Sequence, residues 1–114
     1  MNLQLETRRA EEVHIVDIRG RVTIGPTNDL LSQRLRELVD AGAKKILINL
    51  ADTIQVDSSA ISTLVRGFVS LSRTGGDLKL LAPQGRVREV LQVTHLLGTI
   101  PAFDDEAKAL ASFR

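Results

Sequence analysis

The sequence predicts an α/β fold: a mixed β-sheet of about five strands with about four helices packed on it. Short apolar runs alternate along the chain with stretches whose apolar residues recur at helical spacing, and turn residues separate them. The resulting order is β-β-α-β-α-β-α-β-α, and its strand–helix–strand units favour right-handed crossovers. A chain of 114 residues fits one such domain, so we expect residues 1–114 to form a single domain.

The first two strands are predicted from alternating hydrophobicity. Leu3 and Leu5 alternate with polar neighbours, and the alternation resumes over residues 13–18 before Gly20. We expect a hairpin that turns near residues 9–12.

The first helix and the central strand follow. Residues 25–29 combine turn chemistry with capping side chains, and the leucines after them recur at helical spacing, which predicts a helix over residues 27–41. Residues 45–50 form an apolar run with little alternation, as is typical of a strand covered on both faces.

The second half of the chain repeats this pattern. Residues 51–59 are a polar connection that ends in candidate helix caps, and a helix is expected to start beside Asp57 and end before Gly75. The remaining expected elements are a strand at residues 78–81, a helix from Gly85 to Val93, a short strand within residues 99–103, and a last helix capped by Asp104.

Composition argues against several classes of function. The chain has no cysteine and two histidines far apart in sequence, so we expect no cofactor and no metal site. A net charge of +1 and the lack of Trp and Tyr do not favour nucleic-acid binding. No segment has the apolar length of a signal sequence or membrane span, so we expect a cytoplasmic protein without membrane contact.

A constellation around residue 58 carries the most information. An apolar strand and a loop lead to Val56-Asp57-Ser58-Ser59-Ala60-Ile61 at a helix start, and the Gly75-Gly76 pair and a further strand follow. In order and spacing this arrangement resembles the STAS domain of bacterial anti-sigma-factor antagonists, over nearly the whole chain. The resemblance implies a non-enzymatic partner-switching protein.

The resemblance also implies roles for particular residues. Ser58 matches the serine that a partner kinase, itself the anti-sigma factor, phosphorylates in these antagonists, and Ser59 is the less favoured acceptor. A serine phosphatase is implied as the second partner. The implied partner-binding residues are Asp57, Ser58, Ser59, Thr23, Ile24, Thr27 and Ser62.

Two positions depart from the family pattern. Ala60 stands where a glycine is usual, and its methyl group could block a close approach by the kinase backbone. Thr23 stands where many antagonists carry an acidic residue, which bears on the choice of partner.

Three other interpretations remain open. The chain could be a non-switching scaffold or interaction module of a signalling or transporter assembly, with the serines acting only as helix caps. It could be a nucleotide or small-molecule sensor that uses a helix N-terminus. A hydrolase that pairs Ser58 with His14 or His95 is the weakest of these, since the sequence lacks a nucleophile-elbow glycine pattern.

Overall fold

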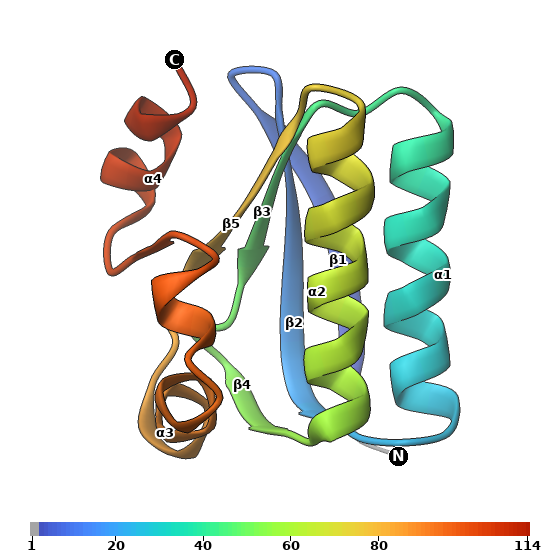
Figure 1. The fold of residues 1–114 in the computed structure, drawn as a ribbon, viewed down its shortest axis with the longest axis vertical. Helices are drawn as coiled ribbons and strands as arrows, with labels where there is room; N and C mark the ends of the chain where they lie inside the picture. Colours follow the sequence, from blue (N-terminus) through green and yellow to red (C-terminus); the bar gives the residue numbers. More distant parts are fainter. Residues whose placement is uncertain (1–2) are drawn as a thin grey trace.

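A computed structural model describes residues 3–114 and shows a mixed six-stranded sheet with helices on both faces (Figure 1). The strands are β1 (Gln4–Ala10), β2 (Val13–Val22), β3 (Lys45–Asn49), β4 (Thr53–Val56), β5 (Asp77–Leu81) and β6 (Ala102–Phe103). The helices are α1 (Pro26–Asp40), α2 (Ser58–Arg73), α3 (Gly85–Val93) and α4 (Glu106–Ser112), with a 3₁₀ turn η1 (Leu96–Gly98). The predicted α/β class is confirmed, with one strand more than expected.

The sheet runs in the order β1-β2-β3-β5-β6, and β4 pairs with the end of β2. β1 and β2 form the predicted antiparallel hairpin, which turns at Glu11 and Glu12, both with positive φ. All the other strand pairs are parallel. The carboxyl end of β2 therefore lies beside that of β4, at the place where α2 begins.

The two faces of the sheet are covered by different helices. Alternate residues of β3 show this, because Ile46 and Ile48 belong to the core formed with α1 and α2, whereas Leu47 packs with Leu110 of α4 and with Phe113, which follows that helix. Figure 1 shows α1 and α2 side by side on one face and α4 on the other. The expectation that this strand is covered on both faces is confirmed.

The segment predicted as a polar connection contains the additional strand, β4. Thr53 and Val56 are buried in it, while Ile54 and Gln55 are exposed. The Thr53 hydroxyl donates a buried hydrogen bond of 2.8 Å to the Ile18 carbonyl on β2. β4 has four residues and pairs with the end of β2, so its formation depends on a partner that is distant in the sequence. Local sequence patterns do not reveal such a partner.

The last helix starts one residue later than predicted, because Asp105 is its cap and Asp104 is not. The Asp105 carboxylate accepts a hydrogen bond of 3.0 Å from the Lys108 N–H, as an N-cap side chain does. The Asp104 carboxylate is largely exposed and lies 3.7 Å from Arg88. Two adjacent aspartates offer equivalent caps in sequence, and only the chain path out of β6 distinguishes them.

Candidate functional site at the start of α2

The candidate site lies where the ends of β2 and β4 meet the first turn of α2. Val22 and Val56 pair in register, and the Asp57 N–H donates a hydrogen bond of 3.2 Å to the Val22 carbonyl. This pairing places the turn after β2 directly beside the start of α2. Figure 1 shows that both segments lie at the same end of the molecule.

Asp57 is the N-cap of α2 and also holds the turn. Its Oδ1 atom accepts hydrogen bonds from the backbone N–H groups of Ser59 at 3.0 Å and Ala60 at 3.1 Å. Its Oδ2 atom accepts one of 2.7 Å from the Ile24 N–H, across a separation of 33 residues. One carboxylate therefore both stabilises the helix start and fixes the turn of residues 23–25.

The hydrogen bonds keep the Asp57 carboxylate ionised. Burial on its own would raise the pKa of Asp57. Hydrogen bonds from the Ser59 hydroxyl and from the Ile24, Ala60 and Ser59 N–H groups outweigh burial and hold the pKa below its ordinary value. The site therefore carries a fixed negative charge at neutral pH.

The turn before α1 has its own internal bonds. The Thr27 hydroxyl accepts from the Thr23 N–H and donates to the Thr23 carbonyl, both at 2.9 Å. Gly25 has a φ of 108°, which favours glycine, and Pro26 follows as the first residue of α1. This arrangement leaves the Ile24 side chain 80% exposed.

Ser58 and Ser59 differ sharply in their surroundings. Ser58 is the first residue of α2 and is exposed, and within residues 3–114 its hydroxyl forms no hydrogen bond. The Ser59 side chain is half-buried, and its hydroxyl donates a hydrogen bond of 2.5 Å to Asp57 Oδ1. Ser58 is therefore open to another molecule, whereas the Ser59 hydroxyl supports the cap.

The other residues named from sequence also gather here. Thr23, Ile24 and Thr27 form the adjoining turn, and Ser62 is exposed one turn along α2 from Ser58, on the same side of the helix. Ala60, in contrast, is fully buried in the core. Its methyl group is therefore covered by the core and does not lie on the exposed surface around Ser58.

One residue that the sequence analysis missed is Ile54. It is 54% exposed on β4, the strand that was not predicted. Together with Ile24, it is a large apolar side chain that remains exposed near the start of α2. The β-branched pair Ile54 and Val56 was the sequence signal that could have indicated this strand.

The structure shows no pairing of either histidine with Ser58. His14 stands near the opposite end of β2 from Val22, a span of about 25 Å at the usual rise per residue. His95 lies beyond α3 with a φ of 61°, and within the described residues neither ring bonds to the serine. The structure gives no support to a serine hydrolase.

Among residues 3–114, no cluster of His, Asp and Glu side chains suits a metal ion, and no helix could cross a membrane.

Comparison with known proteins places the chain in a family. The STAS domain family model matches residues 4–109, and the chain therefore belongs to the STAS domain family. This agrees with the resemblance seen in the sequence.

Relatives and solved structures resemble the chain to different extents. A Thermotoga neapolitana homolog of the protein TM1081 is 34% identical over 74 residues, which span 65% of this chain and 66% of that relative. The anti-sigma F factor antagonist of Paenibacillus polymyxa is 24% identical over 111 residues, covering 96% of this chain and 94% of the relative. The crystal structure of Thermotoga maritima TM1081 superposes with a TM-score of 0.90 at 24% identity, covering 96% of this chain and 94% of that one.

Proposed function

We propose that this chain is an anti-sigma-factor antagonist that works by partner switching. In its unphosphorylated form, the surface around Ser58 binds a serine kinase that is also the anti-sigma factor, and so releases the sigma factor. Phosphorylation of Ser58 ends this binding, and a serine phosphatase restores it. The exposed and unbonded Ser58 hydroxyl at the start of α2 carries the proposal.

The hydrogen bonds of the site favour a phosphate that stays on the surface. A helix N-terminus usually attracts an anion through its free N–H groups. Here the N–H groups of Ser59 and Ala60 are already bonded to Asp57, whose charge also repels a second anion. A phosphate on Ser58 is therefore expected to point outward, toward the partner.

A phosphate in this position changes the binding surface without disturbing the core. It adds about −1.5 to −2 charges next to the exposed Ile24 side chain and the Asp57 carboxylate. A partner that covers this surface must then bury a dianion beside an apolar side chain, which is costly without a compensating cation. Loss of binding follows from desolvation and repulsion.

The contrast between the two serines favours Ser58 as the acceptor. A kinase must place the acceptor hydroxyl beside the catalytic base of the kinase and beside the γ-phosphate of ATP. Ser58 can be presented without breaking any hydrogen bond of its side chain, whereas Ser59 must first leave Asp57. Modification of Ser59 would also remove support from the helix cap.

Binding to the proposed partner, an anti-sigma-factor serine kinase from the same organism, tests the proposal. Ser58→Asp is expected to weaken binding by about a hundredfold or more, because it places a charge within the interface. Ser72→Asp, on an exposed serine near the other end of α2, is the matched control and should bind like the wild type. Equal affinities of Ser58→Asp and the wild type would support the non-switching scaffold instead.

A further inference from the structure

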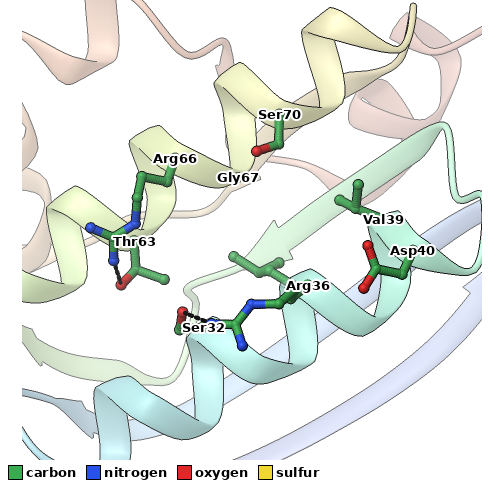
Figure 2. Close-up of a pocket in the computed structure, with 9 residues that line it drawn as sticks. Ser32, Arg36, Val39, Asp40, Thr63, Arg66, Gly67 and Ser70 are labelled. Carbon is green, nitrogen blue, oxygen red and sulfur yellow. Dashed lines mark hydrogen bonds between the residues drawn. The ribbon is translucent and has the colours of Figure 1, made fainter.

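A groove of about 310 Å³ lies on the surface between α1 and α2, a volume that suits a small ligand. Its apolar floor is formed by Leu35 and Val39 of α1 beside Gly67 of α2. A Cβ atom at Gly67 would stand only 3.2 Å from Leu35 Cδ1, so Leu35 occupies the space that a side chain would take. Polar and charged side chains rise on both sides of this floor (Figure 2).

Two arginines from the two helices converge on one end of the groove. The Arg36 guanidinium donates a hydrogen bond of 3.3 Å to the Ser32 hydroxyl, and the Arg66 guanidinium donates one of 3.3 Å to the Thr63 hydroxyl. Figure 2 shows both guanidinium groups turned toward this Ser32–Thr63 end. Within residues 3–114 neither forms an ion pair with a carboxylate, so both positive charges at this end lack an acidic partner.

The other end of the groove has the opposite character. Asp40 and Ser70 line it, and Figure 2 shows the Asp40 carboxylate away from the guanidinium groups. An anion is repelled from this end, whereas a hydroxyl group can donate a hydrogen bond to the carboxylate. The groove is thus polarised along its length.

The lining also limits the class of ligand. Its apolar part is aliphatic, and among the described residues that line it none is aromatic, so it offers no stacking surface for a nucleobase. Guanidinium groups bind phosphate and carboxylate oxygens through paired hydrogen bonds. Two such groups match the double charge of a phosphate monoester better than the single charge of a carboxylate.

We propose that the α1–α2 groove binds a small phosphate monoester with a short hydroxylated aliphatic tail. The phosphate lies between Arg36 and Arg66, the tail lies over Leu35, and a tail hydroxyl reaches Asp40. The groove is formed by side chains other than those of the Ser58 surface. This site therefore does not depend on the proposed phosphorylation.

Titration of the ¹⁵N-labelled full chain with glycerol 3-phosphate, followed by NMR, tests this assignment. Saturable shifts are expected for the amides of Ser32, Thr63 and Gly67. Inorganic phosphate is expected to bind more weakly and to shift only the Ser32 and Thr63 amides. Glycerol, which lacks the charge, is expected to shift none of them.

Variants separate a specific site from general attraction of anions. Arg36→Gln and Arg66→Gln are exposed changes that should leave the fold intact, and each is expected to weaken the Kd by about tenfold through loss of a charge-assisted hydrogen bond. Arg73→Gln, on α2 but outside the groove, is the matched control and should bind like the wild type. The proposal is overturned if glycerol 3-phosphate gives no saturable shifts, if glycerol alone gives the same shifts, or if Arg73→Gln weakens binding as much as Arg66→Gln.

Discussion

At the scale of single residues, Asp57 does most to organise the site. Its carboxylate accepts bonds from two N–H groups of α2, from the Ser59 hydroxyl, and from the Ile24 N–H on the other side of the site. Ser58 next to it forms no side-chain hydrogen bond within the described chain. The residue that builds the site and the residue proposed to be modified are therefore different.

Replacing Asp57 tests this division of roles. Asp57→Ala is expected to lower the free energy of unfolding by about 1–2 kcal/mol, because the helix cap and the bond to the turn are both lost. Ser58→Ala is the adjacent control and should change it by less than about 0.5 kcal/mol. Urea unfolding measures both values, and a loss of stability in Ser58→Ala as large as that in Asp57→Ala would contradict the assigned roles.

Asp17 is a second residue whose charge stabilises the fold. It lies on β2, on the face of the sheet opposite to α1 and α2. It is buried and accepts hydrogen bonds from Arg8 at 2.8 Å and from Asn49 at 2.8 Å, while Arg8 also binds Glu106 of α4. Burial on its own would raise the pKa of Asp17, but the bonds from Arg8 and Asn49 and the charges of Arg8 and Arg19 outweigh it and lower the pKa. The ionised side chain thus helps to join β1, β2, β3 and α4.

The lowered pKa of Asp17 predicts a particular loss of stability in acid. A carboxyl group whose pKa is lower in the folded state stabilises the fold fully above the unfolded value of about 3.9, and this contribution is lost as the pH falls through the folded pKa. Asp17→Asn should lower the free energy of unfolding at neutral pH by about 1–3 kcal/mol. Below about pH 4, the free energy of unfolding of this variant should also fall less steeply than that of the wild type. Urea unfolding from neutral to acid pH checks this, with Asp77→Asn as an exposed control. Parallel curves for wild type and Asp17→Asn would contradict it.

At the scale of secondary structure, local signals located most elements. The hairpin, α1 and both ends of α2 were predicted, because alternation, helical spacing and turn residues act over a few positions. β4 was missed because it depends on pairing with β2, where the register shifts between Gly20 and Arg21. The cap of α4 was misplaced by one residue for a similar reason, since the path of the chain chooses between two aspartates.

The connection from α2 to β5 provides a test at this scale. A Cβ atom at Gly76 would lie 2.6 Å from the Lys44 carbonyl oxygen and 2.8 Å from Leu71 Cγ, which requires the backbone to move. Gly76→Ala is expected to destabilise the fold by about 1–3 kcal/mol. Gly98→Ala meets no atom within 4 Å and should have little effect. Thermal unfolding gives the melting temperatures of the two variants. Equal melting temperatures would contradict the prediction, because they would show that a methyl group at Gly76 is accommodated without cost.

At the scale of the whole molecule, the fold separates a stable core from an exposed end. The core covers both faces of the sheet, whereas Ile24, Ile54 and Ser58 are exposed around the start of α2. The members of this site were named from the resemblance to the STAS domain, which rests on the adjacent residues Asp57, Ser58 and Ser59 at a helix start and implied the turn of residues 23–27 as their neighbour. The sequence did not reveal the bond from Ile24 to Asp57, the exposure of Ile54, or the groove between α1 and α2, since each depends on residues brought together only by folding.

Mass spectrometry tests the central claim most directly, after incubation of the chain with ATP and the proposed partner, an anti-sigma-factor serine kinase from the same organism. Peptide mapping is predicted to find one phosphate, on Ser58, in the wild type and in Ser59→Ala, and none in Ser58→Ala. A wild-type chain that gains no phosphate, or a Ser58→Ala chain that still gains one, would contradict the proposed switch.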